Sequence, residues 1–194
     1  MLKEKNNKFF EKKEIRKKCF LIRKQSAVNN YDSSFNAAKN FLSLVKIKSK
    51  DVIACYWPIN NELDTRPLIS FLSLKKIKIA LPIIEKEKML FKAWNIKEKL
   101  YFSKYKFYEP DKNSKTLSPN IIITPALAVD YSGNRIGYGA AFYDRYYKNN
   151  NTNSYVGFTY ARQVFNTLPF TKHDLKLNSI VTDKFVKKIK FNFQ

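Results

Sequence analysis

The chain has only four glycines, and Gly133, Gly137 and Gly139 lie close together. A sequence that uses glycine so rarely places it where a side chain is not tolerated or where φ is positive. The stretch follows apolar segments and leads into a segment with helical character. Its backbone N–H groups and the helix N-terminus would therefore point toward an anion. The alternative is a tight turn that only joins a strand to a helix.

Charged residues around these glycines favour a phosphate as the anion. Arg135 and Arg145 flank the loop and could clamp phosphate oxygens with their forked guanidinium groups. Asp144 would repel a phosphate unless a cation such as Mg²⁺ lay between them. An ion pair with Arg145 or a nearby lysine is the alternative for Asp144. The stretch lacks the Gly-Lys-Ser/Thr of a Walker loop, and Phe142 stands where a dinucleotide fingerprint needs its third glycine.

Helices and strands alternate along the chain, according to its apolar pattern. Helices are expected at residues 9–28, 32–45, 65–74 and 141–147, with a helical turn at 161–167. Strands are expected at residues 51–57, 77–84, 88–94, 120–124, 155–159 and 179–182. Residues 126–130 either continue the strand at 120–124 or pair beside it. The remainder is a polar excursion at 103–118, an Asn-rich turn at 149–154 and a basic tail. This order predicts an α/β fold with three layers: a mostly parallel central sheet with helices on both faces. We expect one domain, residues 1–194, with a basic N-terminal helix.

The net charge of +21 raises nucleic acid as a partner, and a nucleic-acid-binding protein is the main rival hypothesis. However, the excess is mostly lysine spread along the chain, together with many Asn, Ile, Phe and Tyr residues, as an AT-rich coding sequence would favour. We therefore prefer compositional bias to a dedicated nucleic-acid surface. The same positive field would also suit a phosphorylated substrate.

The remaining composition favours a soluble cytoplasmic protein with no membrane partner. We expect it to act on small molecules as a monomer. No apolar run is long enough to cross a bilayer, and no apolar segment follows the first residues as a secretory signal requires. Cys19 and Cys55 show no metal-ligand spacing, and Cys55 is interpreted as a small core residue.

The sequence also resembles a known family along most of its length. The resemblance rests on Thr124–Asp130 (TPALAVD), on Gly133-x-Arg135-Ile136-Gly137-Tyr138-Gly139 and on Phe142-Tyr143-Asp144-Arg145. These segments resemble the signature of the 5-formyltetrahydrofolate cyclo-ligases, also called methenyltetrahydrofolate synthetases. Further matches follow in the family's order: residues 12–16 (KKEIR), 56–65 (YWPINNELDT), 155–158 (YVGF), 163, 168–169, 173–174 and 180–182.

The resemblance implies an ATP-dependent cyclisation of 5-formyltetrahydrofolate to 5,10-methenyltetrahydrofolate, with release of ADP and phosphate. It assigns ATP binding to Lys12, Arg16, Arg135, Ile136, Gly137, Tyr138, Gly139, Ala140, Ala141, Phe142 and Tyr143. It assigns folate binding to Trp57, Glu62, Tyr138, Gly139, Ala140, Ala141 and Phe142. It places Mg²⁺ on Asp144 and Asp174, and catalysis on Arg145 and Tyr143.

Three positions carry alternatives. The family commonly has glycine where Ala141 stands, which keeps open a second rival, a lapsed domain that binds ATP or folate without turnover. Trp57 is either a platform for the pterin or core packing at a strand end. His173, the single histidine, is expected to position a neighbour or face solvent rather than act as a base.

Overall fold

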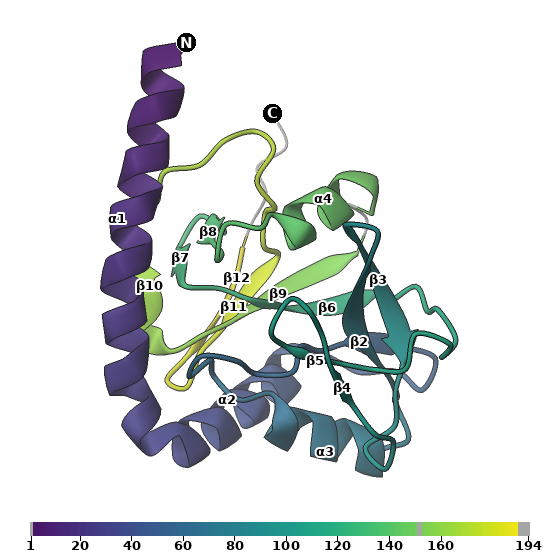
Figure 1. The fold of residues 1–194 in the computed structure, drawn as a ribbon. Coiled ribbons are helices and arrows are strands. Elements are labelled where there is room, and N and C mark those ends of the chain that lie inside the picture. Colours follow the sequence, from purple (N-terminus) through teal and green to yellow (C-terminus); the bar gives the residue numbers. More distant parts are fainter. Residues whose placement is uncertain (1, 151–152, 190–194) are drawn as a thin grey trace.

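The computed structural model describes residues 2–150 and 153–189, arranged around a central seven-stranded sheet (Figure 1). The strand order is β12-β11-β9-β6-β1-β2-β3. The five strands from β11 to β2 run parallel, and β12 and β3 pair antiparallel at the two edges. The strands span Val52–Ala54 (β1), Lys78–Glu85 (β2), Lys88–Ala93 (β3), Ile121–Pro125 (β6), Ser154–Phe158 (β9), Ser179–Val181 (β11) and Val186–Lys188 (β12).

Helices cover both faces of this sheet, because its central strands carry apolar side chains on both sides. In the register of β1, Ile53 lies between Ile79 and Ile121. These side chains pack with α2 (Asn30–Leu44) and α3 (Arg66–Leu74). The neighbouring Ala54 belongs to the opposite face, which packs against aromatic side chains of α4 (Phe142–Asn149). The predicted three-layer α/β fold is confirmed.

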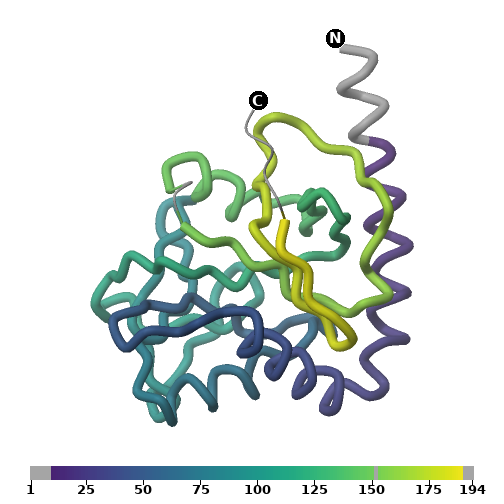
Figure 2. The backbone as a smooth tube through the Cα atoms, turned by 180° about the vertical axis from the view of Figure 1, so that it is seen from behind, coloured from purple at the N-terminus to yellow at the C-terminus, as the bar shows by residue number. Residues whose placement is uncertain are grey.

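The long first helix, α1 (Leu2–Ser26), stands along one side of the molecule (Figure 1). Its buried Cys19 packs against a small sheet of β10 (Val164–Phe165), β7 (Ala128–Asp130) and β8 (Arg135–Ile136). The short helix η1 (Ala27–Asn29) then leads into α2, so the expected break near Asn29 is confirmed. Figure 2 shows the segment between β10 and β11 running beside α1 before it returns to the sheet.

Several predicted boundaries were wrong. The second helix begins at Asn30 instead of residue 32, so Asp32 lies in its first turn. Residues 161–167 form only the short helix η2 (Ala161–Gln163) before β10. The strand expected at 51–57 is limited to β1. After β1 the N–H of Cys55 still donates to the carbonyl of Ala80 in β2 (2.9 Å), but the carbonyl of Tyr56 accepts from the hydroxyl of Thr65, just before α3 (2.5 Å).

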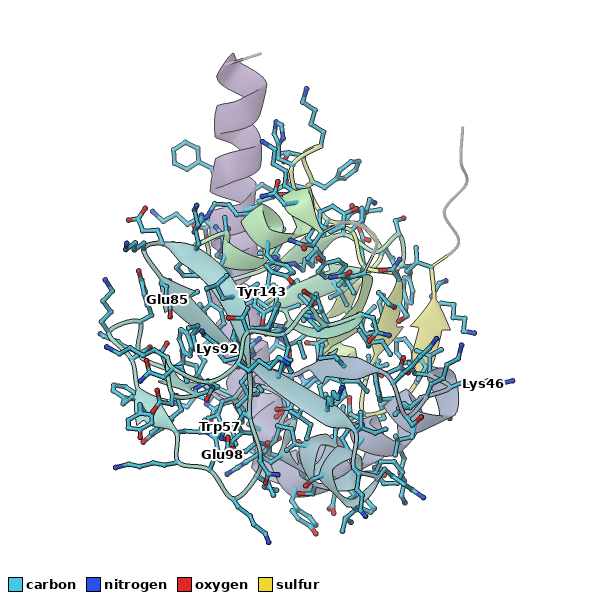
Figure 3. The ribbon with its side chains drawn as sticks, turned by 90° about the vertical axis from the view of Figure 1, so that its right-hand side faces the viewer. Lys46, Trp57, Glu85, Lys92, Glu98 and Tyr143 are labelled. Atoms are coloured by element: carbon cyan, nitrogen blue, oxygen red, sulfur yellow. The ribbon has the colours of Figure 1, made fainter. Side chains whose placement is uncertain are left out.

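Two segments for which the sequence predicted no strand do contain strands. The excursion includes β5 (Tyr108–Glu109), which pairs with β4 (Tyr101–Phe102), and the basic tail includes β12. Residues 151–152 of the Asn-rich turn and 190–194 of the tail lie outside the described residues. Figure 3 shows Lys46 extending away from the body, whereas Trp57 and Tyr143 lie within it. Among the described residues, none of the helices has the length and apolar character needed to cross a bilayer.

Candidate active site

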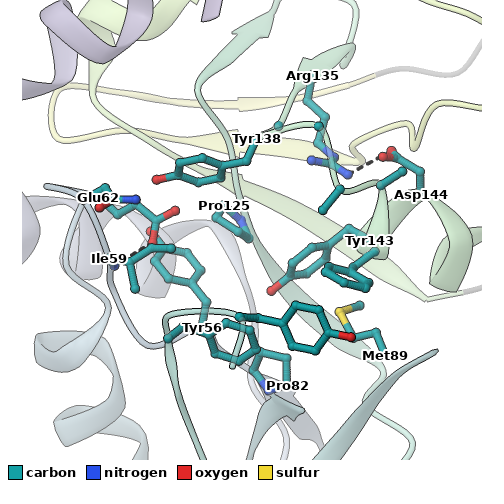
Figure 4. Close-up of a pocket in the computed structure, with 18 of the residues that line it drawn as sticks. Tyr56, Ile59, Glu62, Pro82, Met89, Pro125, Arg135, Tyr138, Tyr143 and Asp144 are labelled. Carbon is teal, nitrogen blue, oxygen red and sulfur yellow. Dashed lines mark hydrogen bonds and ion pairs between the residues drawn. The ribbon is translucent and has the colours of Figure 1, made fainter. Parts of the chain in front are cut away.

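A cavity of about 480 Å³ lies where the carboxyl ends of parallel strands meet the glycine-containing loop (Figure 4). Tyr56 follows β1, and Pro125 is the last residue of β6; both line the cavity. Ligands of open α/β sheets commonly bind at this edge, because the loops that follow the strands converge there. The rest of the wall comes from residues 57–62 after β1, from α1, β2, β3 and the excursion, and from residues 135–144 and Asp174.

The loop adopts backbone conformations that account for its glycines. Gly139 has φ of +110°, which residues with a side chain rarely adopt. At Gly137 a Cβ atom would lie 2.7 Å from Nη1 of Arg135, so a side chain there would displace the guanidinium group. Ala141 precedes α4 in the left-handed region (φ 54°, ψ 22°), where alanine is strained. The loop therefore presents its backbone closely to the cavity, in front of the N-terminus of α4.

Two arginines hold carbonyl groups of this loop. Nε of Arg16, on α1, donates to the carbonyl of Gly137 (2.9 Å). Nη1 of Arg145 donates to the carbonyl of Ala140 (2.9 Å), and its guanidinium lies 4.9 Å from the ring centre of Phe142. Arg16 lines the cavity, whereas Arg145 is exposed and lies outside the lining. The geometry of Arg145 thus suits a support for the loop.

Asp144 and Asp174 line the same cavity, and each is paired with a cation. Oδ1 of Asp144 accepts hydrogen bonds from Nη2 of Arg135 (2.8 Å) and from the N–H of Leu175 (2.9 Å). Oδ2 of Asp174 accepts one from Nζ of Lys12 (2.6 Å). No group of three metal-binding side chains occurs within the described parts of the chain. Two carboxylates alone would need further ligands from water or substrate to hold a metal ion.

Glu62 occupies the opposite side of the cavity, where Tyr138 reaches toward it (Figure 4). Its side chain is buried, and Oε2 accepts a hydrogen bond from the N–H of Ile59 (3.0 Å). Burial raises the pKa of Glu62 to about 7, although the positive charge of Arg23 and the hydrogen bonds from Ile59 and Tyr138 oppose the shift. A buried carboxylate of this kind suits a ligand with several N–H donors.

Aromatic side chains complete the wall. Trp57 is half-buried, lines the cavity and packs edge-to-face on Trp94, with 5.7 Å between the ring centres. It therefore belongs both to the cavity wall and to the core. The hydroxyl group of Tyr143 is buried and has no hydrogen-bond partner among the described residues. Burial raises the pKa of Tyr143, so the hydroxyl stays protonated at neutral pH and can donate to a ligand.

The structure brings together all the side chains predicted to bind ATP, folate and Mg²⁺, because each lines this one cavity. Arg145 lies beside it, and His173 is exposed and outside the lining. Cys55 is fully buried, which raises its pKa to about 12 and confirms it as a core residue. The sequence interpretation missed Arg23 and the excursion residues Tyr105, Lys106 and Phe107.

The fold and the cavity are those of an α/β protein whose one cavity joins a glycine-containing loop to an aromatic wall. A family model described as the 5-formyltetrahydrofolate cyclo-ligase family matches residues 8–183. The chain therefore belongs to the 5-formyltetrahydrofolate cyclo-ligase family.

Similar proteins agree with this assignment. The 5-formyltetrahydrofolate cyclo-ligases of Haemophilus influenzae and Escherichia coli K12 are 27% and 28% identical to this chain, over 80% and 75% of its length and 88% and 85% of theirs. The NMR structure of the Aquifex aeolicus 5,10-methenyltetrahydrofolate synthetase superposes with a TM-score of 0.78 at 28% identity, covering 94% of this chain and 95% of that one. The Mycoplasma pneumoniae synthetase shares the fold, with a TM-score of 0.71 at 19% identity, over 89% and 99% of the two chains.

Proposed function

We propose that this protein converts 5-formyltetrahydrofolate and ATP into 5,10-methenyltetrahydrofolate, ADP and phosphate. One observation carries the proposal. A single cavity joins the glycine-containing loop and the positively charged side chains beside it to a buried carboxylate and an aromatic wall. The loop side suits the triphosphate of ATP. The side with Glu62 and Trp57 suits a planar pterin that carries N–H donors.

The reaction requires a formamide oxygen to leave, and that oxygen is a poor leaving group. In the proposed first step, the oxygen of the N5-formyl group attacks the γ-phosphorus of ATP, and the bond between this phosphorus and ADP breaks. N10 then attacks the formyl carbon, phosphate leaves with the electron pair of the C–O bond, and the N10 proton is released. Positioning and charge stabilisation are the main tasks of a protein in phosphoryl transfer. Arg16 and the loop N–H groups would hold the phosphates, and the Tyr143 hydroxyl would donate a hydrogen bond near the reacting groups.

The residues present fit a magnesium ion bound together with ATP. In each of Asp144 and Asp174, one oxygen accepts all the hydrogen bonds found for that carboxylate within the described parts of the chain. The other oxygen is thus suited to a hard cation, and Mg²⁺ commonly combines one or two carboxylates with waters and substrate phosphates. When bound, the ion would neutralise charge on the transferred phosphoryl group.

The protein is proposed to act as a cytoplasmic monomer on these two small molecules, with its positive charge serving phosphorylated substrates rather than nucleic acid. Size-exclusion chromatography with light scattering tests the monomer. Salt-dependent binding to oligonucleotides would instead favour the nucleic-acid rival.

The activity itself is tested by mixing purified protein with 5-formyltetrahydrofolate, ATP and MgCl₂. The near-ultraviolet absorbance of the methenyl product should grow only in the complete mixture. A folded protein that binds both substrates and yields no product would be the lapsed domain, and the proposed activity would be wrong.

A further inference from the structure

Arg23 is a buried arginine directly behind the cavity wall. It lies on α1 with only 2% of its surface exposed. Its Nη1 donates to the hydroxyl of Tyr138, and its Nη2 donates to the carbonyl of Ala126 (2.5 Å). The guanidinium also lies 5.4 Å from the ring centre of Tyr138, and Nη1 is 3.8 Å from Oε1 of Glu62. Arg23 does not itself line the cavity, whereas Tyr138 and Glu62 do.

Burial of a guanidinium group is costly unless its charge and its donors are matched. Glu62 is the one acidic side chain within ion-pair distance of Arg23 in the described parts of the chain. The attachment of α1 does not depend on this arginine alone, since Cys19, Lys12 and Arg16 also contact the rest of the protein. The position of Arg23 therefore indicates a role at the site in addition to packing.

The groups that face Glu62 come from three elements. They are the guanidinium of Arg23 on α1, the N–H of Ile59 in the segment after β1, and the Tyr138 hydroxyl of the loop. The charge of Glu62 in turn contributes to raising the pKa of the phenol groups of Tyr56 and Tyr143. Arg23 supplies the only positive charge among these groups. Without it, burial would favour the protonated acid, which would no longer accept hydrogen bonds at both oxygens.

We propose that Arg23 is a positioning residue for the folate: it favours the carboxylate form of Glu62 and fixes Tyr138 beside it, so one side chain outside the cavity positions two residues that line it. The inference rests on the proposed contact between Glu62 and the pterin. It separates Arg23 from Arg16, which faces the proposed nucleotide side.

The first test is the pH profile of Arg23→Met. Its KM for 5-formyltetrahydrofolate should rise about tenfold or more at neutral pH, while its KM for ATP changes much less. The decrease of kcat/KM for the folate at low pH should shift to higher pH in this variant. Raising the pH to about 9 should therefore restore part of the lost kcat/KM. Lys24→Met, an exposed neighbour on α1, should match the unaltered protein. A loss of the same size at every pH would indicate structural damage and overturn the inference.

The second test is a double-mutant cycle with Glu62→Gln, which also reports on the Glu62 contact. If Arg23 acts through Glu62, then Arg23→Met should raise the folate KM by a smaller factor in the Glu62→Gln background than in the unaltered protein. Fully additive effects would overturn the role of Arg23. An unchanged folate KM in Glu62→Gln alone would refute the Glu62 contact itself. If Arg23→Met does not fold, Arg23→Lys decides the matter, because it should keep the original decrease of kcat/KM at low pH yet raise the folate KM; an unchanged KM would refute the inference.

Discussion

Arg16→Ala should weaken ATP use far more than folate use. Nε of Arg16 donates to the carbonyl of Gly137 (2.9 Å), and Nη2 lies 3.8 Å from where a Cβ atom of Gly139 would stand. The guanidinium group is therefore beside the backbone that we propose meets the phosphates. A hydrogen bond to a charged group contributes about 1.5–3 kcal/mol. Its loss should raise the KM for ATP roughly 10- to 100-fold.

The assay is steady-state formation of the methenyl product with each substrate varied in turn. Lys17→Ala is the matched control, because Lys17 is exposed on the same helix and pairs only with Glu14 among the described residues (2.8 Å). The control should leave both KM values nearly unchanged. If Lys17→Ala is as harmful as Arg16→Ala, or if Arg16→Ala raises the folate KM equally, only general charge matters and the placement of ATP is wrong.

Three further changes test other parts of the account. Ala141→Gly relieves a left-handed alanine and should leave ATP affinity unchanged or improved in a binding titration, with a large loss showing that the loop depends on its alanine. Asp144→Asn should stay folded yet lose most activity, partly recovered at high magnesium, whereas Asp111→Asn in the excursion should change little; normal turnover of Asp144→Asn at limiting magnesium would contradict metal binding. Burial raises the pKa of Cys19 to about 11 and that of Cys55 to about 12, so neither thiol should react with a thiol reagent near pH 8 until the protein unfolds, and rapid labelling of the native protein would contradict this burial.

The layers of the fold could be predicted because the central strands are apolar on both sides, as at Ile53 and Ala54, which requires cover on both faces. The strands that were missed are short. β10 and β12 are too brief to show a period, and hydrogen bonds to their neighbours define them. The first helix could be placed, but its end positions depend on contacts rather than on its repeating pattern.

The glycine loop could be recognised because scarce glycines marked conformations that other residues avoid. Arg23 could not, because a buried arginine on a lysine-rich helix looks in sequence like its exposed neighbours. Its one signal was its position four residues after Cys19, on the stripe that packs inward. The apolar wall of the cavity, including Met89 and Pro82, was missed because strand residues that line a site have the same pattern as those that fill a core.

The most direct test of the proposed reaction follows the formyl oxygen. The protein is supplied with 5-formyltetrahydrofolate carrying ¹⁸O in its formyl group, together with ATP and MgCl₂, and the released phosphate is analysed by mass spectrometry. If the formyl oxygen attacks the γ-phosphorus, each methenyl product formed should yield one phosphate containing ¹⁸O. Product formation with unlabelled phosphate and ¹⁸O released to water would contradict the proposed phosphorylation.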